Sequence, residues 1–455
     1  MSFRFILVVV FTEQNDDTFD PHVKRKVERP TTYGETMTHM LKGSIGAGIL
    51  AMPEAIRSVG LIYGVIGVLV IGMFACYCLQ LLILAQYQIC KKWRRGYMAY
   101  PKSMKLAIQD GPEFLRWSGK LFYVLVDSML VVWQLGICAI YFVFVGINVA
   151  QVLENYGIVV NIRMMIVFEL PLQIVLNMIK NLKLLTPLSS FSNGLTICAL
   201  LMVFFYLIED NVQIDDDKLK IKSLLSIPSF VGTTLFSLEA VGVVLALEYN
   251  MEEPKRFTGV FGLMSVGFII IISLFVSLGS AGYLKYGENV NASVTLNLPS
   301  NEKKAQIAKL AYALALYLSI PLQNFVAYEI LLRKMKKKIK PENFTIMDYA
   351  LRVILVIIPF TFAVAAPKLG PFISLLGALC LSLVAIMFPA IMDCCVWYPD
   401  KYGFLKYKLV RDIIIIFLSL FCLVSGVYTS LLEFAAGDES HNDSVTTTTE
   451  AARII

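Results

Sequence analysis

Two short stretches of the sequence place glycines and polar side chains inside long apolar runs. The first is HMLKGSIGAG, residues 39–48, and Pro53 follows it. Three glycines within six positions, Gly43, Gly46 and Gly48, weaken a helix in the middle of an apolar run. Backbone groups freed inside a membrane are tolerated only where protein or a water-filled cavity satisfies them. Close helix packing through small residues is the structural alternative for these glycines.

The second stretch is TTLFSLEAVG, residues 233–242, which places Glu239 between Ser237 and Gly242. A helix interrupted here exposes carbonyls at the end of one half and N–H groups at the start of the other. The N–H groups attract a carboxylate, and the carbonyls attract a cation. A zwitterionic amino acid carries both charges on one carbon, so paired interruptions suit its backbone. The two stretches would then open two halves of similar length, as in inverted-repeat transporters.

The composition supplies the membrane setting that these stretches require. The chain has 455 residues, of which 57% are hydrophobic and 16% are charged, whereas soluble domains carry roughly a quarter charged residues. This excludes a cytosolic enzyme and a nucleic-acid-binding module. Apolar runs of about 20 residues mark transmembrane helices, and we predict eleven of them: 37–58, 60–85, 121–150, 164–182, 184–208, 224–248, 258–284, 305–331, 346–366, 369–394 and 409–432.

The positions of lysine and arginine predict the orientation, because cytoplasmic loops are enriched in both. With a cytoplasmic amino terminus, the basic runs 24–26, 91–95 and 333–338 all face the cytoplasm. The acidic run 215–217 then lies outside. The sequon at Asn291 also lies outside, in a long connection, where it is a candidate glycosylation site.

Three segments resemble the proton-coupled amino acid transporters of the amino acid/auxin permease superfamily. They are HMLKGSIGAGILAMPEAIRSVG in the first run, WQLGICAIYFVFVGINV in the third and FSLEAVGVVLALEYNMEEP in the sixth. The resemblance implies an all-α integral membrane protein with eleven transmembrane helices, a LeuT-like 5+5 inverted repeat and broken helices 1 and 6. It also implies proton symport of small neutral amino acids such as alanine, glycine and proline. The proton is then the coupling ion, and no cofactor is expected.

The polar composition of both ends and the apolar runs between them predict three regions, and the resemblance implies the membrane. We expect a disordered cytoplasmic amino terminus at residues 1–35, an eleven-span transporter domain at 36–434 and a disordered extracellular or lumenal tail at 435–455. The expected location is the plasma membrane or a lysosomal or endosomal membrane. The expected partners are the lipid bilayer and small neutral amino acids, and the protein is expected to work as a monomer.

Individual residues can be matched to the motifs of this family. His39 matches a first-span histidine implicated in proton coupling, and Glu239 matches the sixth-span glutamate. The expected substrate-binding residues are Gly43, Ser44, Gly46, Ala47, Gly48, Ser237 and Glu239. Ser44 and Ala47 depart from the Asn and Thr of vertebrate members. The connections 151–163 and 285–304 also lack the cysteine pair of the family.

Two residues compete as the proton carrier. The imidazole of His39 titrates near pH 6.5 when unperturbed, so a modest gradient can change its charge. A carboxyl such as Glu239 in a dry site can also bind a proton. The alternatives are a neutral, hydrogen-bonded histidine and a permanently charged glutamate. Asp127 and Glu169 also lie in apolar runs, but near their ends, and we predict that both are structural and reach water or a lysine.

The sequence also bears on other functions. The sequence contains no HExxH motif, no paired catalytic carboxylates and no metal-ligand spacing, so we expect neither an enzyme nor a metal site. Sodium coupling is the main alternative within transporters. It is disfavoured because the eighth run offers only Ser319 before Pro321 rather than adjacent hydroxyls. Uncoupled transport and a sensor that binds amino acids without flux remain open.

Overall fold

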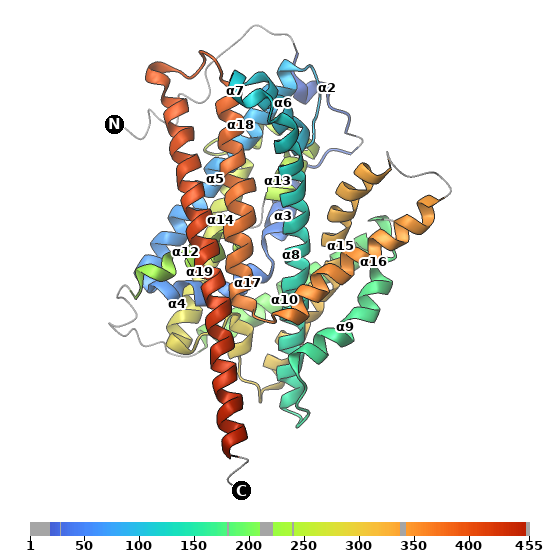
Figure 1. The fold of residues 1–455 in the computed structure, drawn as a ribbon, viewed down its shortest axis with the longest axis vertical. Coiled ribbons are helices and arrows are strands. Elements are labelled where there is room, and N and C mark those ends of the chain that lie inside the picture. The colour runs from blue at the N-terminus through green and yellow to red at the C-terminus, as the bar shows by residue number, and fades with distance from the viewer. Residues whose placement is uncertain are drawn as a thin grey trace.

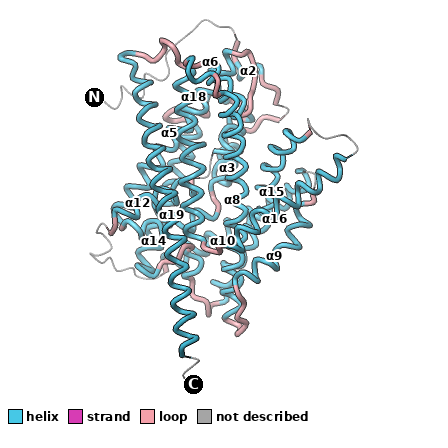
Figure 2. The backbone as a smooth tube through the Cα atoms, viewed as in Figure 1, coloured by secondary structure: helices cyan, strands magenta, loops and turns pink. Residues whose placement is uncertain are grey.

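The computed structural model of the chain describes residues 19–27, 29–179, 182–209, 222–238, 241–336 and 343–451. Helices account for most of these residues, and they pack side by side into an elongated bundle (Figure 1). The described residues form no sheet, as Figure 2 shows. The all-helical class predicted from the sequence is therefore confirmed.

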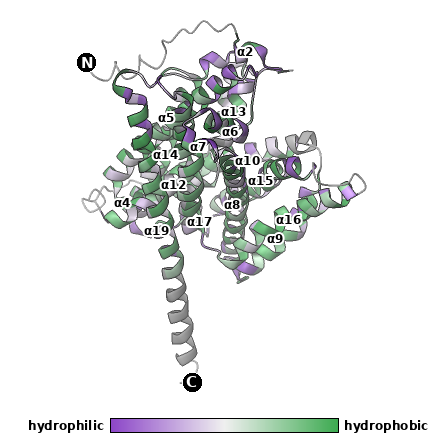
Figure 3. Ribbon diagram, turned by 45° about the horizontal axis from the view of Figure 1, so that its top comes forward, coloured by the Kyte–Doolittle hydropathy of each residue, from purple (hydrophilic) through white to green (hydrophobic). Residues whose placement is uncertain are grey.

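Among the described residues, eight helical segments are long and apolar enough to cross a membrane. They are formed by α5 (Leu61–Lys92), α8 (Gly119–Glu154), α10 (Leu182–Ile208), α14 (Leu263–Tyr286), α15 (Lys303–Met335), α16 (Phe344–Ala365), the continuous run α17 (Leu369–Leu376), η6 (Gly377–Met387) and α18 (Phe388–Val396), and α19 (Tyr407–Ala451). Each overlaps one predicted apolar run. Most of the long helices are coloured as hydrophobic along much of their length in Figure 3, as membrane-spanning helices require.

The three other predicted spans consist of shorter elements. The fourth is α9 (Ile162–Asn177), of 16 residues. The first is split into α3 (Tyr33–Ser44) and α4 (Ala47–Val59), and the sixth into α12 (Ile227–Ser237) and α13 (Val241–Asn250). The count of eleven transmembrane helices and the 5+5 repeat therefore stay predictions.

A direct backbone contact holds α12 against the tenth predicted span. A side-chain carbon at Gly377 would lie 1.8 Å from the carbonyl oxygen of Gly232, and one at Gly232 would lie 2.4 Å from the carbonyl oxygen of Ser374. Because no side chain fits at either position, the two helices touch through their backbones. This contact fixes α12 firmly against α17 and η6.

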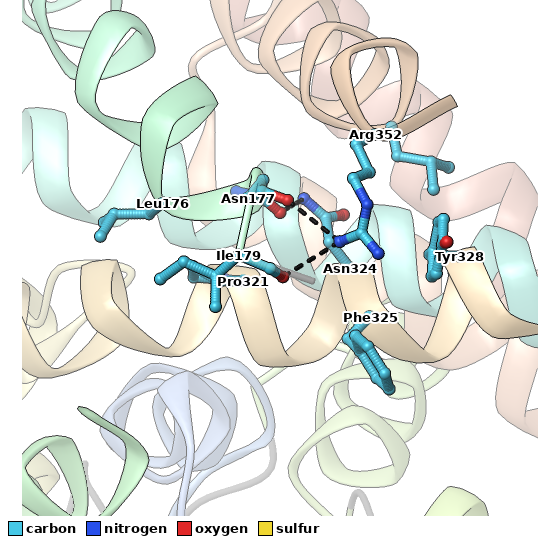
Figure 4. Close-up of a pocket in the computed structure, with 9 residues that line it drawn as sticks. Leu176, Asn177, Ile179, Pro321, Asn324, Phe325, Tyr328 and Arg352 are labelled. Atoms are coloured by element: carbon cyan, nitrogen blue, oxygen red, sulfur yellow. Dashed lines mark hydrogen bonds between the residues drawn. The ribbon is translucent and has the colours of Figure 1, made fainter. Parts of the chain in front are cut away.

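On the other side of the bundle, α9, α15 and α16 run at a tilt to the main axis (Figure 1). Figure 4 shows the polar junction that joins them. The guanidinium of Arg352 donates to the carbonyls of Asn177, at 3.2 Å, and Ile179, at 3.1 Å. Nδ2 of Asn324 donates to Oδ1 of Asn177 at 3.0 Å. Arg352 thus satisfies free carbonyls at the end of α9, where a cation is favoured.

The amino-terminal strap, which we define as residues 19–27 and 29–32, lies at the upper end of the bundle and includes the short helix α2 (Pro21–Lys24) (Figure 1). Nε2 of His22 lies 2.7 Å from the carboxylate of Glu248. The guanidinium of Arg25 donates to four carbonyls at the end of α13: those of Glu248, Tyr249, Met251 and Glu252. The strap therefore caps α13 with a cation, as a helix carboxyl terminus favours.

An ion pair at the edge of the strap adds to this hold. Asp20 lies 3.0 Å from the ammonium of Lys255. Partial burial raises the pKa of Asp20, but the hydrogen bonds from Lys255 and from the backbone of His22 outweigh it and hold the pKa below its ordinary value.

The predicted regions at the two ends of the chain stay predictions, but the structure describes part of each end. Residues 19–27 and 29–32 form the strap, and α3 begins at Tyr33. At the other end, α19 continues through the predicted tail as far as Ala451. The polar composition of these stretches did not reveal the contacts that order the strap.

Candidate functional site

The first interruption separates α3 from α4. Thr32 and Glu35 form a capping box that starts α3, with the backbone N–H of Thr32 donating to the Glu35 carboxylate at 2.8 Å. The helix ends at Ser44. Ile45 and Gly46 are extended, with φ/ψ of −96°/92° and −131°/−156°. Gly46 gives α4 no side-chain cap, so the first N–H groups of α4 lack the usual partner.

The second interruption separates α12 from α13. α12 ends at Ser237, and Leu238 leaves the helix with φ/ψ of −82°/33°. Glu239, predicted to bind substrate or a proton, lies outside the described residues. In Figure 1, α3 and α13 lie in the upper half of the bundle, and α4 and α12 lie in the lower half.

Ser237 joins the two interruptions. Its hydroxyl oxygen lies 2.9 Å from the carbonyl of Gly48 and 2.8 Å from that of Thr233, so its proton has an acceptor in each helix. A side-chain carbon at Gly48 would lie 2.5 Å from the Cα of Ser237. Gly48 is therefore the position at which α4 and α12 meet backbone to backbone, which is the packing role that we weighed as the alternative for these glycines.

A tyrosine from α15 binds the first interruption. The hydroxyl of Tyr312 donates to the carbonyl of Gly46 at 2.9 Å. Its ring is fully buried and lies 5.7 Å from that of Phe144 in α8. Tyr312 thereby satisfies one carbonyl that the break releases. The sequence analysis missed it, although it lies within the apolar run 305–331.

Buried polar atoms without a hydrogen-bond partner among the described residues surround the second interruption. They are Oγ1 of Thr234, in the last turn of α12, and Oε1 of Gln134, in α8. Gln134 faces the start of α13, since a side-chain carbon at Gly242 would lie 3.8 Å from its Nε2. Oδ1 of Asn148, farther along α8, is also unpartnered. Buried polar groups normally have partners, so these atoms are available to a polar ligand. The sequence did not predict a role for Gln134, because its neighbours in the chain do not reveal that it faces α13.

The structure separates the other predicted site residues. Ser44 is buried, and its hydroxyl donates to the carbonyl of Met40 in its own helix at 3.1 Å. Ala47 is buried at the start of α4, and Gly43 is half-buried near the end of α3. His39 is exposed on α3, seven positions before Gly46, and so lies away from the interruption. Asn291 is exposed, as a glycosylation site must be.

The two carboxylates predicted to be structural behave differently. Asp127 in α8 is buried and lies 3.0 Å from the ammonium of Lys334 in α15, which agrees with the prediction. Glu169 in α9 is 9% exposed, and both of its carboxylate oxygens are buried without a partner among the described residues. The prediction that Glu169 reaches water or a lysine is therefore wrong, because α8 and α15 cover it.

Comparison with known proteins identifies the family of the chain. Residues 29–432 match the family described as transmembrane amino acid transporter protein. The chain is 33% identical over 428 residues to the proton-coupled amino acid transporter-like protein pathetic of Drosophila melanogaster, covering 94% of this chain and 90% of that protein. It is 25% identical over 422 residues to the amino acid transporter ANT1 of Arabidopsis thaliana, covering 88% and 92%. These relatives are transporters and not enzymes, as the sequence predicted.

Solved structures show the same fold at low sequence identity. The inward-facing conformation of Mhp1 aligns with a TM-score of 0.56 and 13% identity, over 95% of this chain and 94% of that one. Mhp1 in a closed conformation with bromovinylhydantoin bound aligns with a TM-score of 0.51 and 12% identity, over 92% and 94%. The interrupted helices, the fold and the sequence match agree, and the chain belongs to the family of transmembrane amino acid transporter proteins.

Proposed function

We propose that this protein is a secondary active transporter that moves small neutral amino acids, of the alanine, glycine and proline type, in symport with a proton. The observation that carries the proposal is the meeting of two interrupted helices at Ser237 and Gly48, beside unpartnered polar atoms. A helix break at membrane depth is costly unless a ligand, protein or water uses the freed groups. Amino acid transport by the family supports the choice of ligand.

The two helix ends at the interruptions have opposite polarity. The uncapped start of α4 presents N–H groups and the positive end of a helix dipole, which suit the substrate carboxylate. The end of α12 presents carbonyls and the negative end, which suit the substrate ammonium. Thr234 and Gln134 then supply further hydrogen bonds. A small, uncharged side chain fits best because Phe236 and Trp133, whose ring centroids are 5.3 Å apart, line the same region of α12 and α8.

The proposal includes the wider arrangement predicted from the sequence. The amino terminus is cytoplasmic, eleven spans form a LeuT-like 5+5 repeat, and the protein works as a monomer in the plasma membrane or a lysosomal or endosomal membrane. Asn291 carries a glycan on the opposite side. His39 and Glu239 are the two competing candidates for the proton carrier that the sequence predicts.

The test is uptake of a panel of labelled amino acids into proteoliposomes that contain the purified protein. Accumulation of small neutral amino acids that requires an inward proton gradient supports the proposal. Accumulation that requires a sodium gradient would instead favour sodium coupling. Flux that depends on neither the proton nor the sodium gradient would favour uncoupled transport. Saturable binding without flux would favour a sensor. The hydroxyls of Ser319 and Ser192, 2.9 Å apart, would be the first place to look for a sodium site.

A pair of isosteric variants tests the position of the site. Thr234→Val removes a hydroxyl that is fully buried and unpartnered at the break. If that hydroxyl binds substrate, the KM should rise by about 2- to 12-fold, the equivalent of one neutral hydrogen bond of roughly 0.5–1.5 kcal/mol. Thr361→Val is the matched control, since the exposed Thr361 hydroxyl bonds only to the carbonyl of Ile357 in its own helix. An unchanged KM in Thr234→Val would remove Thr234 from the substrate site.

A further inference from the structure

Glu169 presents a carboxylate to the protein interior, and no residue that the structure describes supplies it with a counter-charge. Its side chain projects from α9 towards α8 and α15. A side-chain carbon at Gly146 of α8 would lie 3.5 Å from Oε1 of Glu169. The hydroxyl of Tyr317 in α15 donates to the backbone carbonyl of Glu169 at 2.9 Å and leaves the carboxylate itself free. Neither carboxylate oxygen has a hydrogen-bond partner among the described residues.

Two other buried carboxylates show what an ionised group requires. Asp127 is paired with Lys334, and Asp348 is paired with Arg352 at 3.3 Å. An ionised carboxylate buried without a partner is strongly disfavoured and takes up a proton instead. In this conformation Glu169 is therefore stable as the neutral acid.

The charged groups on neighbouring helices are too far along the bundle to neutralise Glu169. Tyr317 of α15 is the titratable group in contact with it. Arg352 of α16 binds the carbonyl of Asn177, about 12 Å farther along α9 at 1.5 Å per residue. Lys309 lies a similar distance, about 12 Å, before Tyr317 in α15 and donates to Gln151 and Leu298. Asp127 lies more than five turns before Gly146 in α8.

The same two helices connect Glu169 with the interruption between α3 and α4. α15 carries Tyr317, which binds the backbone of Glu169, and Tyr312, which binds the carbonyl of Gly46. α8 carries Gly146 beside the carboxylate and Phe144 against the ring of Tyr312. A change in the charge of Glu169 changes how closely α8 and α15 can pack around it, and both helices contact the break or the tyrosine bound to it.

We propose that Glu169 is the proton-binding carboxylate of the transport cycle, an inference that rests on the proposed proton symport. In the step, a carboxylate oxygen accepts one proton from the water of the acidic side and forms an O–H bond. After the conformational change, that bond breaks and the proton passes to water on the other side. Glu169 is buried, whereas His39 is exposed. Glu169 also contacts α8 and α15, which pack around the break between α3 and α4.

The experiment compares three variants in proteoliposomes by two transport assays. Counterflow measures the exchange of external labelled substrate for unlabelled substrate inside the vesicles without a proton gradient. A pH dye inside the vesicles measures proton entry during acid-driven uptake. Glu169→Gln, which keeps the shape of the neutral acid, should retain counterflow but lose accumulation and proton entry. Glu169→Asp should recover part of both. Asp127→Asn, a buried carboxylate with its own lysine, should keep acid-driven accumulation.

The outcomes separate this inference from the proposed function. If the wild-type protein takes up no amino acid, or takes it up without protons, the proposed symport fails and takes the role of Glu169 with it. If the wild-type protein is proton-coupled and Glu169→Gln still accumulates substrate with proton entry, only the role of Glu169 is overturned.

Infrared spectroscopy of the purified protein gives a readout that does not depend on transport. A protonated carboxyl has a C=O band distinct from those of carboxylates and amides. The wild-type protein should show at neutral pH a carboxylic acid band that Glu169→Gln lacks and Glu169→Asp shifts. Identical spectra for the wild type and Glu169→Gln would mean that Glu169 is ionised in this protein and would overturn the inference.

Discussion

Replacing Tyr312 by phenylalanine removes one hydroxyl and leaves the rest of the side chain in place. In the structure that hydroxyl donates to the carbonyl of Gly46 at 2.9 Å, inside the break between α3 and α4. Leaving a buried carbonyl without its donor costs about 1–3 kcal/mol. If the break changes shape during transport, the bond stabilises one conformation over another, and its loss shifts that equilibrium by roughly 5- to 150-fold.

We therefore expect Tyr312→Phe to transport at a rate at least several-fold below that of the wild type, with normal amounts of protein in the membrane. Tyr100→Phe is the matched control. The hydroxyl of Tyr100 is also buried and donates to a helix carbonyl, that of Val384, at 2.9 Å, but Val384 belongs to η6 rather than to a break. Initial uptake rates in proteoliposomes and thermal stability are measured for both variants. Equal stability losses together with wild-type transport in Tyr312→Phe would refute the reasoning.

Three further outcomes are expected. Gly48→Ala should lower the thermal stability and the amount of folded protein, because its side chain meets the backbone of α12, whereas Gly34→Ala, with open space around it, should not; equal stability would contradict the contact. A tag at the carboxyl terminus should be accessible from outside, and one near Lys336 only after permeabilisation; tags on one side would make the span count wrong by one. The pKa of Asp20 is held below its ordinary value, so its contacts should protect the strap from hydrogen exchange at neutral pH and be lost as the pH falls below about 4. Asp20→Asn should lose this protection already at neutral pH. Unchanged protection in this variant would exclude the ion pair with Lys255.

The interruptions could be predicted from sequence because they have a local cause. Glycines spaced closely within an apolar run weaken the helix wherever the run lies, and the chain does leave the helix at Ile45 and Gly46. The role of each glycine could not be predicted in this way, because it depends on segments that are distant in the sequence. Gly48 looked like part of a ligand site, but the structure shows that α12 lies directly against it. Only the path of a helix nearly two hundred residues away determines that role.

Contacts between distant segments account for the other differences. Tyr312 is one of several aromatic residues in apolar runs, and nothing in its own sequence neighbourhood selects it. Glu169 lies near the start of its run, so water seemed within reach. Because α9 is short and packs against α8 and α15, the carboxylate is covered instead. Arg25 lies in a polar stretch that appeared disordered, and its partners are backbone carbonyls, which no residue pattern reveals.

The amino-terminal strap has a mechanical consequence for the two upper half-helices. Thr31 exchanges backbone hydrogen bonds with Asn250 and Glu252 at the end of α13, each at 2.8 Å, and α3 begins two residues later. These hydrogen bonds thus join the start of α3 to the end of α13, and the hydrogen bonds of Arg25 strengthen this connection. Because these contacts join the two half-helices, a movement of one during transport would require the other to move with it. A ligand that binds the strap would therefore restrict the movement of both α3 and α13.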